Sequence, residues 1–124
     1  MNSEDFVKEY HEIAERALKL AEKARREGFL VIDELIDEDK YDQRDVMELG
    51  LRLVVDGLDS AFVDKVLTNI INLETDTEIK VLKTIKKEAV LSLQAGKNPR
   101  LIAVLLNSYV NIENEYAMKQ YNRL

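Results

Sequence analysis

Hydrophobic residues recur along this chain at spacings of three and four, the period of an α-helix that buries one face. The first such stretch begins near Ser3, a favourable N-cap residue, and runs to Gly28. A glycine inside a helix costs roughly 1 kcal/mol relative to alanine, so we expect a bend or break at Gly28 and a short helix over residues 29–36. The hydrophobic positions of the first stretch are Phe6, Tyr10, Ile13, Ala17, Ala21 and Ala24.

Two more helices are predicted after a polar connection at residues 37–42. Asp42 is a candidate N-cap for the first of them, and Gly57 ends it in the left-handed conformation that follows many helices. Asp59 is the candidate N-cap of the second. We expect the first to bury Val46, Leu49, Leu53 and Val54, and the second to bury Phe62, Val63, Val66, Leu67, Ile70 and Ile71.

The remaining sequence predicts two further helices. Thr75 and Glu78 have the spacing of a capping box, which starts a fifth helix that Gly96 ends. Asn98 and Pro99 then open a sixth, because proline is tolerated in the first turn of a helix. Residues 111–124 are polar and weakly periodic, and are either a tail or a last helix. The expected buried positions are Ile79, Leu82, Ile85, Ala89 and Leu93 in the fifth helix, and Leu101, Ile102, Leu105 and Leu106 in the sixth.

Composition agrees with this helical pattern. The 124 residues are 46% hydrophobic and include no Trp, four Gly and one Pro, so few residues interrupt long helices. We predict an all-α fold, a compact bundle of about five to six helices with a bent first helix. Residues 1–74 supply the first four helices and residues 75–124 the rest, together forming one domain.

Charge and hydropathy exclude two classes of partner. The net charge is −6, whereas a nucleic-acid-binding protein needs a net basic face. The N-terminus is acidic and lacks the hydrophobic core of a signal peptide. The longest hydrophobic run, residues 101–106, is far shorter than the roughly 20 residues that span a membrane. We therefore expect a soluble chain with no membrane span and no nucleic acid.

One basic stretch stands out against this acidic background. Residues 76–100 carry six basic and three acidic side chains. Lys80, Lys83 and Lys87 share one face of the predicted fifth helix, and Lys86 lies beside them. Three interpretations remain open, namely a solvated face, a site for an anionic partner, and a surface that faces a membrane.

No set of residues indicates an enzyme or a metalloprotein. Cysteine is absent, and His11 is the only histidine, which is most simply explained as a surface residue. Asp37, Asp39 and Glu48 match three positions of a calcium-binding loop, but Asp42 stands where that loop requires glycine. We therefore predict no catalytic residue, no metal and no cofactor.

Three segments, in this order, resemble motifs of one protein family. Residues 24–30, ARREGFL, resemble the pattern A-R-R-E-G-L-L. Residues 50–59, GLRLVVDGLD, resemble G-L-x-L-x-x-D-G-x-D, and residues 89–100, AVLSLQAGKNPR, resemble A-x-L-x-I-Q-x-G-x-N-P-R. The pattern is similar to the cytoplasmic parts of the MotA family of bacterial flagellar motor stators, and it covers roughly residues 20–110.

The resemblance also includes one large departure. In that family a transmembrane hairpin separates the second motif from the third, whereas here residues 73–76 join them directly. The resemblance therefore implies an engineered or truncated cytoplasmic domain in which two cytoplasmic pieces are fused, from a parent at the cytoplasmic face of the bacterial inner membrane. A natural soluble paralogue is the alternative. Lys80, Lys83, Lys86 and Lys87 would then be the basic flank of a membrane-emerging helix.

The function that the resemblance implies is torque generation in motility. Members of the family form a ring, here expected to be a pentamer, around MotB, and ion transport through the membrane part drives the ring. Their cytoplasmic part pushes on the rotor protein FliG through charged side chains. The family's functional arginine matches Arg25 and its functional acid matches Asp33, where the family usually has Glu; Arg26 and Glu34 lie beside them.

The bend at Gly28 is expected to place Arg25 and Asp33 at an exposed tip. Two alternatives to the stator interpretation stay open. One is the cytoplasmic part of an ion-driven motor related to TolQ or ExbB. The other is an unrelated soluble helical adaptor.

Overall fold

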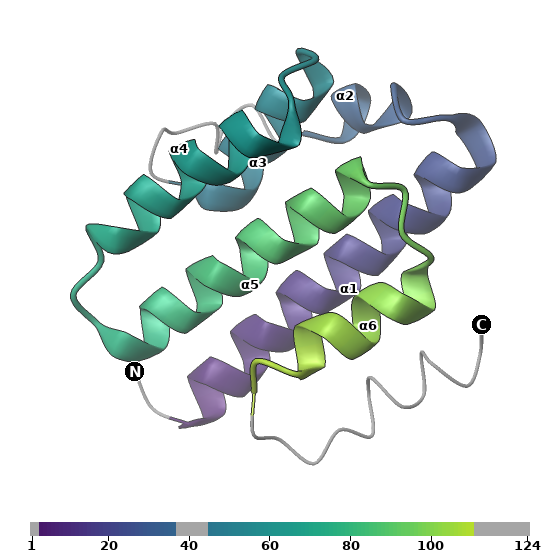
Figure 1. The fold of residues 1–124 in the computed structure, drawn as a ribbon. Helices are drawn as coiled ribbons and strands as arrows, with labels where there is room; N and C mark the ends of the chain where they lie inside the picture. The colour runs from purple at the N-terminus through teal and green to yellow at the C-terminus, as the bar shows by residue number, and fades with distance from the viewer. Residues whose placement is uncertain (1–2, 37–44, 111–124) are drawn as a thin grey trace.

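The structure, a computed structural model, describes residues 3–36 and 45–110, and its regular elements in these ranges are six α-helices (Figure 1). The predicted all-α bundle is confirmed. In chain order the helices are α1 (Ser3–Glu27), α2 (Val31–Leu35), α3 (Val46–Val55), α4 (Ser60–Asn72), α5 (Thr77–Gln94) and α6 (Pro99–Asn107). The predicted break is also confirmed, because Gly28 has a φ of 90° between α1 and α2. The segments 37–44 and 111–124 lie outside the described residues; they include Asp37, Asp39 and Asp42 of the rejected calcium-loop match and the last-helix alternative.

Helix α5 is the centre of the bundle and contacts α1, α3, α4 and α6, while α2 packs against α1 and α3 (Figure 1). All six helices contribute to one hydrophobic core, which unites the segments on both sides of the α4–α5 connection. Each helix supplies at least one residue that is at most 1% exposed: Tyr10, Ile32, Leu51, Leu67, Ile85 and Ile102.

Several predicted helix boundaries are confirmed by their cap hydrogen bonds. Asp59 accepts a hydrogen bond from the backbone N–H of Phe62 at 2.8 Å, and Asn98 accepts one from the N–H of Arg100 at 2.8 Å, with Pro99 opening α6. Gly57 adopts a φ of 88°, as predicted for the residue after a helix end. These features are local, so the sequence specifies them without knowledge of the tertiary structure.

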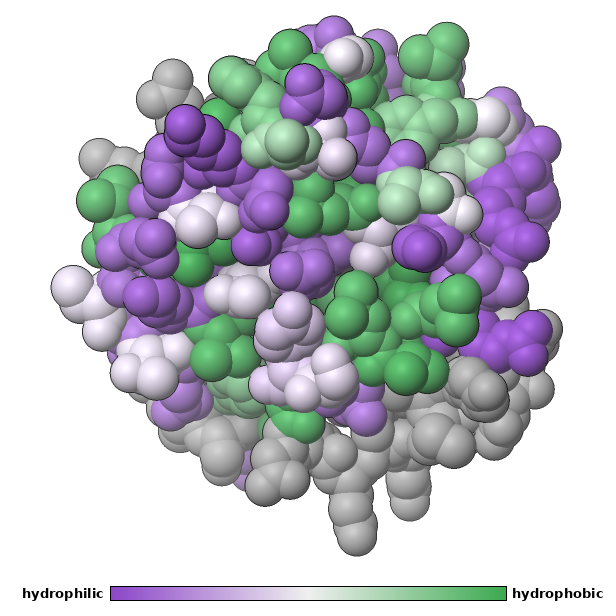
Figure 2. Space-filling model, in the orientation of Figure 1, coloured by the Kyte–Doolittle hydropathy of each residue, from purple (hydrophilic) through white to green (hydrophobic). Residues whose placement is uncertain are grey.

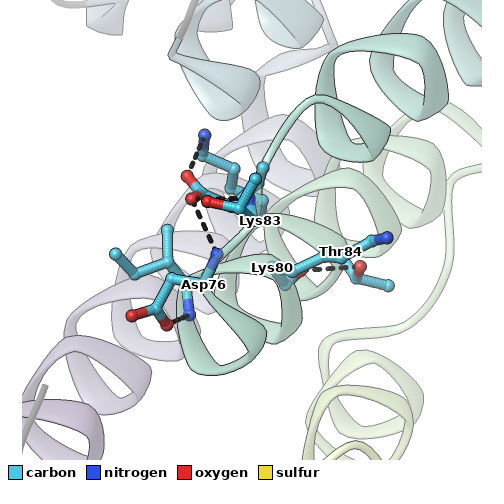
Figure 3. Close-up of polar contacts among 7 residues, drawn as sticks. Asp76, Lys80, Lys83 and Thr84 are labelled. Carbon is cyan, nitrogen blue, oxygen red and sulfur yellow. Dashed lines mark hydrogen bonds and ion pairs between the residues drawn. The ribbon is translucent and has the colours of Figure 1, made fainter.

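Two predicted caps are wrong. The capping box of Thr75 and Glu78 does not form; Asp76 is the N-cap of α5 and accepts a hydrogen bond from the N–H of Ile79 at 3.0 Å (Figure 3). Asp42 lies outside the described residues, and α3 is capped by Asp45, which accepts from two backbone N–H groups at 3.1 Å. In both cases an aspartate directly before the first helical residue takes the cap, as its short acidic side chain favours.

The predicted buried faces of α4 and α6 are too wide. In α4 only Val63, Leu67 and Ile71 are buried, whereas the Phe62 side chain is 50% exposed. In α6, Leu101 is 56% exposed, and hydrophobic side chains gather over this helix on the face shown in Figure 2. Both helices lie at the side of the bundle, so only part of each hydrophobic face meets another helix.

Candidate interaction surface

The three segments with family-like motifs meet at one end of the bundle. The Gln94 Nε2 donates a hydrogen bond to the backbone oxygen of Leu58 at 2.8 Å, which joins the end of α5 to the α3–α4 turn. Ala24 and Phe29, from the first segment, line one cleft together with Leu93 of the third. We call this region, formed by residues 24–30, 56–59 and 94–100, the motif end.

Two of the three turns at the motif end, those after α3 and α5, are held by the same type of backbone hydrogen bond. After α3, the N–H of Leu58 bonds to the oxygen of Leu53 at 3.1 Å; after α5, the N–H of Lys97 bonds to the oxygen of Ser92 at 3.0 Å. Such bonds, reaching back over a left-handed glycine, satisfy carbonyl groups that a helix end otherwise leaves open. The side chains of these two turns are therefore carried on a hydrogen-bonded backbone.

Arg25 and Arg26 project from the last turn of α1 at this end, and both side chains are exposed. Within residues 3–36 and 45–110, the structure gives neither arginine an ion pair. With Glu22 and Pro99 they line a shallow cleft of about 400 Å³. On the face shown in Figure 2, hydrophilic side chains also gather at the edge where α1 ends.

Asp33 and Glu34 lie on α2, beyond the Gly28 turn, and both are exposed. Asp33 is nevertheless engaged, because its Oδ1 accepts a hydrogen bond from Nη1 of Arg52 on α3 at 2.8 Å. Arg52 also lies 3.9 Å from Asp56. The predicted acid is thus solvent-accessible but paired within the chain, and Arg52 is a residue that the sequence analysis did not single out.

The four lysines of α5 have different surroundings. Lys83 Nζ contacts Glu74 Oε1 at 2.9 Å (Figure 3), and Lys87 Nζ contacts Asp64 Oδ1 at 2.9 Å and Thr68 Oγ1 at 3.1 Å. These contacts tie α4 and the α4–α5 connection to α5. Lys80 is exposed and Lys86 is partly buried, and neither has an ion pair among the described residues.

Two of the acids that contact these lysines, Asp64 and Glu74, have a pKa below the ordinary value. The hydrogen bond from Lys87, followed by that from Thr68, lowers the pKa of Asp64. The hydrogen bond from Lys83, followed by the backbone N–H of Asp76, lowers the pKa of Glu74. The lowered pKa values reflect the short contacts that Lys83 and Lys87 make with the two carboxylates.

Glu48, weighed above as a calcium ligand, is instead 1% exposed and forms an ion pair with Arg16 of α1. Arg16 Nη2 also donates to the backbone oxygen of Leu35 at 3.3 Å. His11 is partly buried, with its ring centroid 5.6 Å from that of Tyr10. These polar groups belong to the packing of α1, α2 and α3.

Two general properties complete the description of the residues whose structure is given. No group of three or more His, Cys, Asp or Glu side chains among them could hold a metal ion. None of their helices is long and hydrophobic enough to cross a lipid bilayer.

No protein-family model, curated protein or solved structure matches the chain.

Proposed function

We propose that this chain is the cytoplasmic region of a flagellar motor stator protein of the MotA type, which transmits torque by charged contacts with the rotor protein FliG. The observation that carries the proposal is the exposed pair Arg25 and Arg26 in the last turn of α1, without an ion pair among the described residues. The proximity of the three family-like segments at the motif end supports it.

Exposed charge pairs suit a stator–rotor contact that must form and break as the rotor turns. An exposed charge pair contributes about 0–1 kcal/mol and steers encounter without holding the partners together. The chain carries a net charge of −6. The exposed arginines at one end therefore form a local region of positive charge that attracts an acidic surface.

Asp33 takes part by exchange. Its side chain is 53% exposed while it contacts Arg52 at 2.8 Å, so a cation on the rotor can replace Arg52 without opening the core. The exchange replaces one exposed charge pair by another, which requires little net free energy.

In the proposed parent protein, the membrane hairpin would be inserted at the α4–α5 connection. Residues 73–76 join two helices that pack against each other, and Leu73 is 82% exposed at their shared end. In the proposed parent, a hairpin would leave here, with Lys80 and Lys86 in its basic flank and MotB inside the ring. Lys83 and Lys87 have the additional role of holding α4 against α5.

Binding to the C-terminal domain of FliG, measured by calorimetry at low salt, tests the proposal. Arg25→Glu should weaken binding about five- to tenfold, and added salt should weaken the binding of the unmodified chain. Lys8→Glu is the matched control, since Lys8 is exposed on the same helix and the change in charge is identical. Binding that is unaffected by both Arg25→Glu and high salt would refute the proposed contact.

A further inference from the structure

A second cleft, of about 340 Å³, lies at the motif end between the end of α1 and the α5–α6 connection. Its floor is hydrophobic and its rim is polar. Ala21 and Leu93 are buried in the floor, with exposed fractions of 2% and 3%. The remaining lining residues are Ala24, Arg25, Phe29, Gln94, Gly96 and Lys97.

The cleft exists because small residues line it. Ala21 and Ala24 present only methyl groups from α1, and a Cβ built on Gly96 would meet nothing within 4 Å. Phe29, on the turn after α1, adds a partly buried aromatic wall. The space has the character of a pocket for a hydrophobic side chain of a partner.

The charged groups on the rim are both cationic. Arg25 and Lys97 are exposed, and Arg25 also borders the neighbouring cleft with Arg26. Gln94 uses Nε2 to bond Leu58, and its Oε1 has no hydrogen-bond donor among the described residues. The Oε1 atom is itself buried, so the rim offers a partner two cations for a carboxylate.

We infer that the cleft receives a hydrophobic side chain of a partner protein, next to an acidic residue whose carboxylate binds Arg25 and Lys97. The buried hydrophobic side chain slows dissociation of the partner, and the carboxylate contact fixes its orientation. Both effects are common at protein interfaces. The inference rests on the proposed function for the identity of the partner, but not for the chemistry of the cleft.

Binding of the C-terminal domain of FliG to two variants tests this inference. Ala24→Leu fills the cleft and keeps every charge, and Lys97→Glu reverses a rim charge on an exposed connection. Each should weaken binding at least about fivefold. Ala61→Leu is the matched control, because Ala61 is exposed on α4. Thermal unfolding of each variant separates a lost contact from a lost fold.

A small probe tests the cleft without the rotor. Phenylacetate, titrated into the full chain and followed by NMR, should shift the backbone amides of Ala21, Phe29, Gly96 and Lys97. Phenylacetamide, which lacks the charge, should bind at least about fivefold more weakly, and Ala24→Leu should abolish the shifts.

The two proposals fail in different ways. If Arg25→Glu weakens binding while Ala24→Leu and Lys97→Glu do not, the rotor contact stands and the cleft inference is overturned. If the rotor domain does not bind at all, the proposed function fails. The cleft inference then stands or falls on whether phenylacetate shifts these amides.

Discussion

Gly50 of α3 lies directly against Val90 of α5. A Cβ built on Gly50 would lie 3.0 Å from both Cγ atoms of Val90 and 2.9 Å from Cδ1 of Leu67 on α4. The absence of a side chain at this position therefore allows three helices to pack closely. Gly50 and Val90 belong to the second and third family-like segments, so this contact links them in the core.

Gly50→Ala should destabilise the fold. Overpacking a core costs about 1–3 kcal/mol, and the gain in helix propensity returns roughly 1 kcal/mol, so we expect a net loss of up to about 2 kcal/mol. The free energy of unfolding in urea measures it. In a Val90→Ala background two of the three close atoms are removed, and the third, Leu67 Cδ1, is the end of a flexible side chain that can shift, so Gly50→Ala should become neutral or stabilising. An equal loss in both backgrounds would contradict this explanation.

Asp64→Asn should remove a part of the stability that depends on pH. The folded pKa of Asp64 lies below its ordinary value of 3.8, so above about pH 5 its carboxylate stabilises the fold. As pH falls through that value, the unfolded chain takes up the proton first, and this contribution is lost. Asp64 is half exposed, so we expect a difference of about 0–1 kcal/mol at pH 6.

Urea unfolding at pH 6 and at pH 2.5 checks this expectation. The difference in unfolding free energy between the unmodified chain and Asp64→Asn should shrink at the lower pH. Lys87→Met removes the main cause of the lowered Asp64 pKa. The difference in unfolding free energy between it and the unmodified chain should therefore also shrink at pH 2.5. A difference that persists at pH 2.5 would show that the Asp64–Lys87 contact is not its source.

Arg16→Met should destabilise the fold by about 1–3 kcal/mol, because it leaves Glu48 buried without that ion pair. Arg16→Lys should cost less, since it keeps the charge and loses the second donor to Leu35. The double variant Arg16→Met with Glu48→Leu should recover most of the loss. Urea unfolding measures all three, and a double variant as unstable as Arg16→Met would contradict the assignment.

Arg52→Ala should strengthen binding to the FliG domain if Asp33 exchanges partners. Removing Arg52 frees the Asp33 carboxylate for a rotor cation, so we expect a gain of about two- to fivefold at low salt. Asp33→Asn should reverse this gain. Calorimetry on the single and double variants gives the answer, and a weaker Arg52→Ala complex with an intact fold would count against exchange.

Local signals in the sequence predicted most of the fold. Asp59, Asn98 and Gly57 act on their own neighbours, so their roles were predictable from spacing alone. The exposure of Phe62 and Leu101 was not predictable, because it depends on which neighbouring helices cover α4 and α6. Hydrophobic periodicity identifies the face that can be buried, not how much of it another helix covers.

The candidate site was only partly predictable for the same reason. The exposure of Arg25 follows from its place on the polar side of α1. That Arg25 lines one cleft with Lys97 and Gln94 could not be predicted, because the third segment reaches α1 only in the folded bundle. Likewise, Asp33 and Arg52 are 19 residues apart, and nothing in the local sequence pairs them.

Helix α1 has a mechanical consequence. Its 25 residues form a rod of about 38 Å, supported along its length by α5 and α6. A force applied at Arg25 would therefore act on one continuous helix. No break in α1 separates Arg25 from the opposite end of the molecule. Gly28 ends the helix just past Arg25, so α2 lies outside this rod and is held separately, by its packing on α1 and α3.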